Sequence, residues 1–282
     1  MPDYHLYDEW LEGERQNWTK SEASFHSEFK MYTDYSIGFL TRGCFRKCPF
    51  CVNKKYNHVF KHSPLDEFYD PSRKKICLLD DNFFGCPHWR EMLEQLRATK
   101  KPFVFKQGLD ERLLNDEKCE LLFGSKYDGD LIFAFDNIED YDLIKSKLEI
   151  IDKYRKKKNV KFYVLTGFES TDITDIENTF KRIALLLEHG CMPYVMRYQN
   201  KNEKPYLSSP FKDMYVTLAR WCNQPSFIKK ISFREFCHKS QEMNKKKICS
   251  AMRALNMIEK DYPHIAETYF DITMNTNRAA HN

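Results

Sequence analysis

Apolar runs of strand length recur along the middle of the chain and alternate with longer stretches of helical periodicity. The strand-like runs are residues 35–40, 75–80, 102–107, 131–136, 160–167 and 191–197. The helix-like stretches are 87–99, 115–124, 138–158 and 172–189. Strands separated by helices of this length indicate right-handed crossovers and a parallel sheet. The pattern predicts an α/β fold with too few strands for a closed eight-stranded barrel.

Polar residues follow nearly every strand-like run. The clearest are Asp80, Asp81 and Asn82, then Gln107 and Asp110, Asp136 and Asn137, Thr166 and Glu169, and Arg197 and Gln199. In a parallel α/β barrel the carboxyl ends of the strands converge on one face, which holds the active site. Connecting loops are polar in any protein, so the argument depends on the repetition across five strands.

The alternation divides the chain into three parts. We expect an N-terminal wrapping segment at 1–34, the α/β core at 35–207 and a helical C-terminal extension at 208–282. In the extension, the pattern predicts helices at 211–223, from Ser232, and at 241–260. Ser232 with Glu235 three residues on is typical of a capping box.

Three cysteines follow the first predicted strand within the stretch YSIGFLTRGCFRKCPFCVN, at Cys44, Cys48 and Cys51. Thiolates are soft ligands that suit iron–sulfur clusters, zinc or copper(I). A [4Fe–4S] cluster normally takes four cysteines, so a loop that supplies three leaves one iron open to a substrate or cofactor. Gly43 permits a tight turn just before the first thiol.

This C-x3-C-x2-C spacing, with the aromatic Phe50 before the last cysteine, resembles the signature of the radical S-adenosylmethionine (SAM) superfamily. The local form TRGC resembles the branch that contains methylthiotransferases and cobalamin-binding radical enzymes. The resemblance implies a partial (β/α)6 barrel, with the helical extension closing the barrel or shaping the substrate pocket. It also implies that the open iron chelates SAM and that reductive cleavage yields a 5′-deoxyadenosyl radical, which abstracts hydrogen from a substrate.

The resemblance further implies SAM-binding residues at the ends of several strands. Asp80 or Asp81 stands where the family commonly has a Gly-Gly-Glu-like segment for the SAM amino group, and the glycines are missing here. Asp136 matches the residue that bonds the ribose, because a carboxylate accepts well from vicinal hydroxyls. The segment with Gly167 and Glu169 partly matches the Gly-rich segment near the adenine.

The same resemblance implies Phe50 beside the adenine, and an electron donor such as flavodoxin or ferredoxin as partner. The segment before the cysteine motif is short and lacks a three-cysteine pattern, so we expect neither a cobalamin-dependent enzyme nor a methylthiotransferase. The substrate stays open between a nucleoside, a peptide and a small molecule. Arg197 could bind a carboxylate or phosphate, or pair with an acid of the barrel.

A zinc-stabilised binding protein is the alternative, with the same cysteines purely structural. A structural zinc site takes four ligands, and the fourth would come from a residue outside ordinary zinc-finger spacing. The candidates are His58, His62, Cys77, Cys86 and His88.

Composition and charge bear on where this protein works and on whether it binds nucleic acid. The 282 residues carry 45 basic and 41 acidic side chains, a net charge of +4 that is too small by itself to indicate nucleic acid. With no signal peptide and no long apolar run, we expect a cytoplasmic protein without a membrane span. The basic run at 153–161 is best explained as a solvated helix end, with a nucleic-acid patch as the alternative.

The other cysteines are expected to pack as small buried hydrophobes. Cys222, Cys237 and Cys249 lack the close Cys-x2-Cys pairs with which one loop wraps a metal. We therefore predict no second cluster in the C-terminal extension.

Overall fold

The structure is a computed structural model that describes residues 34–244 and 247–275. It separates into two compact units. Unit 1 comprises residues 34–110 and 124–129, and unit 2 comprises 111–123 and 130–275 among the described residues. The predicted wrapping segment at 1–34 lies outside the described residues except for its last residue.

Unit 1 is built on a parallel three-stranded sheet in the order β1-β4-β5. Its strands are β1 (Tyr35–Gly38), β4 (Lys75–Leu78) and β5 (Phe103–Phe105), and α3 (Trp89–Ala98) forms the crossover between β4 and β5. The fully buried Ile76, Leu78 and Phe105 alternate with half-buried residues along the strands. A second, antiparallel pair, β2 (Thr41–Arg42) with β3 (Phe60–Lys61), closes the base of a long loop.

Unit 2 contains another parallel sheet, in the order β6-β7-β8. The strands are β6 (Leu131–Ala134), β7 (Val160–Thr166) and β8 (Met192–Arg197), joined by the crossover helices α5 (Tyr141–Tyr154) and α6 (Ile173–Glu188). The shorter α4 (Asp116–Phe123) packs on α5. Asp172 caps α6 by accepting the backbone N–H groups of Thr174 and Asp175.

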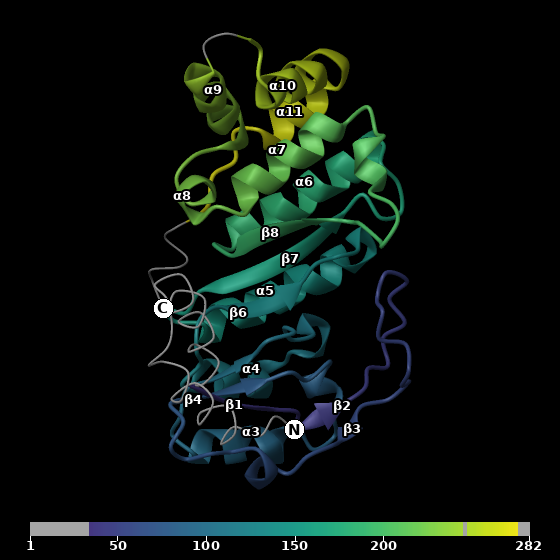
Figure 1. The fold of residues 1–282 in the computed structure, drawn as a ribbon. Coiled ribbons are helices and arrows are strands. Elements are labelled where there is room, and N and C mark those ends of the chain that lie inside the picture. The colour runs from purple at the N-terminus through teal and green to yellow at the C-terminus, as the bar shows by residue number, and fades with distance from the viewer. Residues whose placement is uncertain (1–33, 245–246, 276–282) are drawn as a thin grey trace, which may run out of the picture. The chain divides into compact units, whose positions relative to one another are not determined.

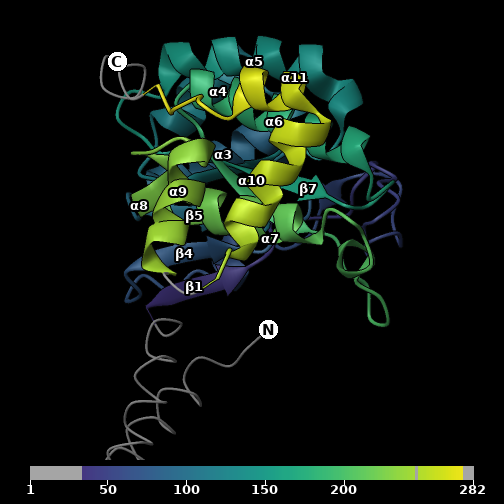
Figure 2. The ribbon, with the colours of Figure 1, turned by 90° about the horizontal axis from the view of Figure 1, so that it is seen from above.

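The C-terminal helices continue the core of unit 2. Helix α7 (Lys212–Cys222) contacts β8, α10 (Ser250–Asp261) contacts α7, and α11 (Pro263–Tyr269) contacts α6, as Figures 1 and 2 show. Two further helices are α8 (Pro225–Ile228) and α9 (Phe233–Met243). One continuous apolar cluster joins α6, β8 and these helices around Trp221 and Phe233, so the extension is part of this core.

The predicted α/β class with parallel strands is confirmed, and each of the six predicted strands contains an observed one. The described strands do not form a closed barrel. The capping box at Ser232 is confirmed. The helix predicted at 241–260 instead begins at Ser250, where the Cys249 sulfur accepts the Met252 N–H as an N-cap. In the part of the chain described, no helix is both long and apolar enough to cross a membrane.

Candidate functional site

The three cysteines lie on the loop between β2 and β3 in unit 1. Gly43 opens this loop with φ of +90°, and a Cβ there would come within 2.2 Å of the His58 carbonyl oxygen. Only glycine fits such a position without moving the backbone. Cys48 and Cys51 are joined by a turn in which the Cys51 N–H donates to the Cys48 carbonyl at 3.0 Å. All three thiols are half-buried.

N–H groups point at the sulfurs of Cys44 and Cys51. The backbone N–H of Arg46 donates to Cys44 Sγ at 3.4 Å, and that of Asn53 donates to Cys51 Sγ at 3.4 Å. The Asn82 side chain adds a second donor to Cys44 Sγ at 3.5 Å. Hydrogen bonds to cysteine sulfur stabilise negative charge on it, and in iron–sulfur proteins they help to set the reduction potential.

The donor set is that of a thiolate-bound metal, but the thiols do not form a closed site as they stand. Among the described residues, no three His, Cys, Asp or Glu side chains are grouped closely enough to hold a metal ion. In their chemistry the residues fit a thiolate-bound metal, because they are soft ligands on one short loop and N–H donors are directed at the Cys44 and Cys51 sulfurs.

Asp80, at the end of β4, is a buried carboxylate that holds the start of the cysteine loop. Its Oδ1 accepts hydrogen bonds from the Thr41 backbone N–H and hydroxyl, each at 2.6 Å, and its Oδ2 accepts the Leu40 N–H at 3.3 Å. Burial raises the pKa of Asp80 to about 6, against the opposing effect of these hydrogen bonds. The side chain is thus occupied by the protein's own backbone.

Asp81 lies on the other side of the strand end and is more accessible. Asp81 is only half-buried, and its Oδ2 accepts the Gly43 N–H at 3.2 Å. The sequence left these two adjacent acids as alternatives, and they differ in burial and in hydrogen-bond partners. Asp80 has both oxygens engaged by Leu40 and Thr41, while the half-buried Asp81 is the more accessible carboxylate.

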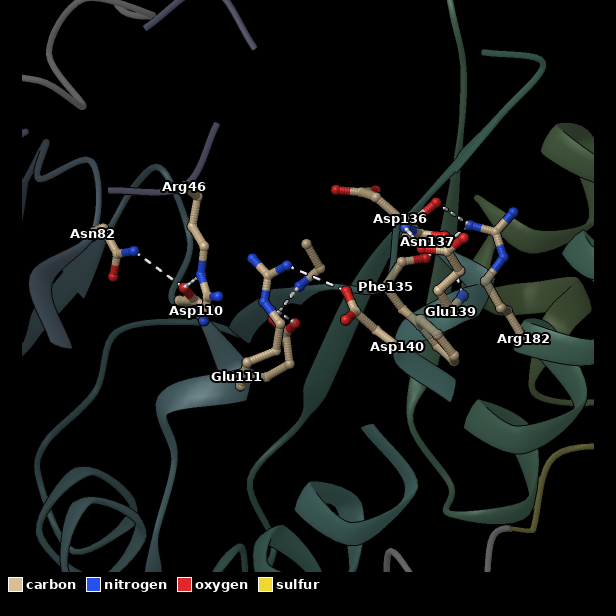
Figure 3. Close-up of polar contacts among 12 residues, drawn as sticks. Arg46, Asn82, Asp110, Glu111, Phe135, Asp136, Asn137, Glu139, Asp140 and Arg182 are labelled. Atoms are coloured by element: carbon tan, nitrogen blue, oxygen red, sulfur yellow. Dashed lines mark hydrogen bonds and ion pairs between the residues drawn. The ribbon is translucent and has the colours of Figure 1, made fainter. Parts of the chain in front are cut away.

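Asn82 connects Cys44 to the partly buried ion pair of Arg46 and Asp110. Its Nδ2 donates to Asp110 Oδ2 at 3.1 Å, and Arg46 Nε donates to the same oxygen at 2.9 Å (Figure 3). The Asp110 carboxylate only accepts hydrogen bonds, so the amide must present its nitrogen. Asn82 is 2% exposed, and its Oδ1 has no hydrogen-bond partner among the described residues.

In unit 2, Asp136 follows β6 and bonds to the neighbouring strand. Its Oδ1 accepts the Leu165 N–H at 3.0 Å, and burial raises the pKa of its carboxyl. The buried Arg182 of α6 donates to the carbonyl oxygens of Phe135 and Asp136 at 2.9 and 2.8 Å (Figure 3). This clamp fixes the backbone that carries Asp136.

Gly167 begins the loop after β7, with φ of +71°. Its N–H donates to Asp175 Oδ2 at 2.9 Å, and the same oxygen accepts the hydroxyls of Thr166 and Tyr215, each at 2.8 Å. Asp175 therefore holds the turn between β7 and α6. The bond from Asp136 to Leu165 brings the ends of β6 and β7 together, so Asp136 and Gly167 belong to the same edge of this sheet.

The remaining predicted residues are Glu169, Phe50 and Arg197. Glu169 is exposed, and Phe50 is half-buried on the cysteine loop. The Arg197 guanidinium lies 4.9 Å from the centre of the Tyr206 ring, a cation–π contact. Arg197 thus has an aromatic neighbour, an arrangement that neither sequence alternative included.

Sequence reasoning missed three supporting residues: Asn82 as a sulfur donor, Arg46 as a partner of Asp110, and Glu111. The buried Glu111 accepts the Ala134 N–H at 3.1 Å, and the adjacent Arg112 pairs with Asp140 at 3.2 Å, both within unit 2 (Figure 3). Asn82 and Asp110 carried a signal, since both follow predicted strands. Arg46, inside the cysteine motif, carried none.

Comparison with known proteins adds no family assignment. No family model matches this chain, and neither does any curated protein.

Proposed function

We propose that this protein is a radical SAM enzyme, with Cys44, Cys48 and Cys51 holding a [4Fe–4S] cluster that leaves one iron for SAM. In this proposal the six parallel strands belong to a partial (β/α)6 barrel. The substrate is a molecule from which hydrogen is abstracted, and a flavodoxin or ferredoxin supplies the electron.

The observation that carries the proposal is the cysteine loop itself. Three thiols lie on one loop that starts at a glycine no other residue can replace, and backbone N–H groups donate to Cys44 and Cys51. Loading requires the three sulfurs to approach one another. The loop is tied at its base by β2 and β3, while its tip is open, with Val52 99% exposed.

The neighbouring residues would prepare this loop for the cluster. Asp80 anchors Leu40 and Thr41 and so fixes where the loop begins. Asn82 donates to Cys44 Sγ and is itself held by Asp110. We assign the SAM amino group to Asp81 in preference to Asp80, because both Asp80 oxygens already accept buried donors.

On the second sheet, Asp136 would accept from the ribose hydroxyls, using Oδ2 while Oδ1 keeps its bond to Leu165. The Arg182 clamp, which binds backbone carbonyl oxygens, would hold the segment of chain that carries that carboxylate. The family resemblance assigns the adenine to Gly167 and Glu169 of unit 2 and to Phe50 of the cysteine loop in unit 1. When bound, the cluster and SAM would supply the electron and the 5′-deoxyadenosyl radical, chemistry that no side chain provides.

Metal analysis tests the proposal most directly. Protein purified and reconstituted without oxygen should hold about four iron and four sulfide per chain, and with dithionite it should convert SAM to 5′-deoxyadenosine. Replacing any one of Cys44, Cys48 or Cys51 by Ala should remove the cluster. The matched control is Cys77→Ala, since Cys77 is a half-buried thiol on β4 of the same unit.

Two outcomes would contradict the proposal. Wild-type protein that binds one zinc tightly and no iron would favour the zinc-stabilised binding protein. Iron that is retained by the three Ala variants, or lost equally in Cys77→Ala, would show that the cluster is held elsewhere or nonspecifically.

A further inference from the structure

A basic pocket lies in unit 2 at the amino ends of β7 and β8. It has a volume of about 180 Å³, and Val160 and Met192, the first residues of these strands, contribute to its wall. Asp136 and Gly167 lie at the opposite, carboxyl ends of the same sheet. Because β7 has seven residues at about 3.3 Å each, roughly 20 Å of strand separates this pocket from that edge.

The turn between α5 and β7 supplies most of the charge. Arg155, Lys157 and Lys158 line the pocket from this turn, and Lys229 joins them from the end of α8. The turn is tightly formed: Lys156 has φ of +48°, and the Lys158 N–H donates to the Arg155 carbonyl at 2.9 Å. Four cationic side chains therefore surround one small space.

Among the described residues of the wall, acidic side chains are fewer than basic ones. Asp130 is the one carboxylate among the lining residues that the structure describes, and it pairs with Lys161 at 2.7 Å. Asp152 lies 3.7 Å from Arg155 but also pairs with His189 at 2.7 Å. Burial lowers the pKa of Lys158, which a bound anion would raise again.

Arg155 is the fixed element of the pocket. It is 1% exposed, and its terminal nitrogens donate to the carbonyl oxygens of His189 and Gly190 at 2.7 and 3.1 Å. Its Nε, which is buried, has no hydrogen-bond partner among the described residues. A buried, unsatisfied charged donor is costly, and a hydrogen-bond acceptor that reached this nitrogen would relieve that cost.

We propose that this pocket binds a phosphate group. A fixed guanidinium beside flanking lysines suits phosphate: the terminal nitrogens of Arg155 are held by backbone carbonyls, so it offers its Nε–H and its charge, and each Lys offers a mobile point charge. The basic run at 153–161 is then more than a solvated helix end, because Arg155 is turned inside while Lys157 and Lys158 border the opening. The phosphate could come from a free anion or from the backbone of a nucleic acid.

The test is a titration of the whole protein with inorganic phosphate, followed by NMR at the Arg155 Nε–H and the Asn159 amide. We expect saturable shifts at both, and an affinity about tenfold lower in Lys157→Gln/Lys229→Gln, which removes two charged donors. The matched control is Lys145→Gln/Lys239→Gln, two exposed lysines of α5 and α9 outside the pocket. It should bind within about twofold of wild type, since its contacts are unchanged.

A single-stranded RNA oligonucleotide separates the two sources of phosphate. If a nucleic acid supplies it, the salt dependence of RNA binding should fall by about two ion equivalents in Lys157→Gln/Lys229→Gln and stay the same in the control. RNA affinity that is equal in both variants, with phosphate binding lost in the first alone, would identify a free anion. Absence of saturable shifts in wild type, or equal weakening by both variants, would overturn the phosphate site. None of these outcomes depends on a cluster being bound.

Discussion

Replacing Asp80 by Ala should destabilise the start of the cysteine loop. The substitution removes the acceptor of three donors, the N–H groups of Leu40 and Thr41 and the Thr41 hydroxyl. Leu40 and Thr41 are 1% and 0% exposed, so water reaches these donors poorly. At the lower end of about 1–3 kcal/mol for each unsatisfied buried donor, the loss in the free energy of unfolding is about 3 kcal/mol at pH 7.5. The lower end applies because the substitution also removes a buried charge.

The cost of Asp80→Ala should depend on pH in a defined direction. The pKa of Asp80 is raised from 3.8 to about 6 in the folded protein, so between these values the folded state binds a proton that the unfolded state has released. The resulting stability is fully present below pH 3.8 and is lost as the pH rises through 6. Acidification therefore raises the free energy of unfolding more in the wild type than in the variant. The loss caused by Asp80→Ala should be about 1–2 kcal/mol larger at pH 5 than at pH 7.5.

Urea denaturation at the two pH values, with hydrogen exchange of the peptide that contains Leu40 and Thr41, measures both effects. The control is Asp81→Ala, which removes the neighbouring half-buried carboxylate and its bond to Gly43. It should cost about 1 kcal/mol, the penalty for one unsatisfied donor, and leave the Thr41 amide protected. Equal stability of Asp80→Ala and wild type, or a penalty that grows as the pH rises, would refute the assignment of Asp80 as a buried anchor.

Three further outcomes follow from the same geometry. Asp136→Ala should weaken SAM binding by about 10- to 150-fold without loss of the cluster, because it removes a charged hydrogen-bond acceptor. Equilibrium dialysis of the reconstituted protein measures the affinity, and an unchanged value would place the ribose elsewhere. Lys100→Gly should raise the free energy of unfolding by about 0.5–1 kcal/mol, because Lys100 has φ of 57°, and a lower urea midpoint would contradict this. Replacing Cys222, Cys237 and Cys249 together by Ala should leave about four iron per chain, whereas a fall from about eight to four would reveal a second cluster.

The periodicity of apolar residues was sufficient to locate the strands and the crossover helices, because both depend on local burial patterns. Ser232 and Glu235 likewise carry their capping box in the sequence. The helix expected from 241 shows the limit of this reasoning. Met243 and Ile248 continue an apolar pattern, yet both are exposed and the next helix begins at Ser250. An apolar pattern does not say which residues find a packing partner. Tertiary contacts decide whether such a stripe is buried.

The candidate site likewise has features that the sequence predicts and features that only the tertiary structure shows. Spacing alone was enough to propose Cys44, Cys48 and Cys51 as candidate ligands, since residues on one short loop are local in sequence. It could not distinguish Asp80 from Asp81, because adjacent acids at a strand end look alike until packing turns one inward to Thr41. Nor could it pair Asn82 with Cys44, thirty-eight residues away.

The basic run at 153–161 was visible as charge, but its role was decided by the tertiary structure. Arg155 is buried because it satisfies the carbonyl oxygens of His189 and Gly190, more than thirty residues along the chain. Lys157, two residues later, stays exposed. A sequence sets which groups can be charged or can coordinate a metal. Which of them are desolvated, and which partners they meet, depends on contacts between distant segments that form only when the core is packed.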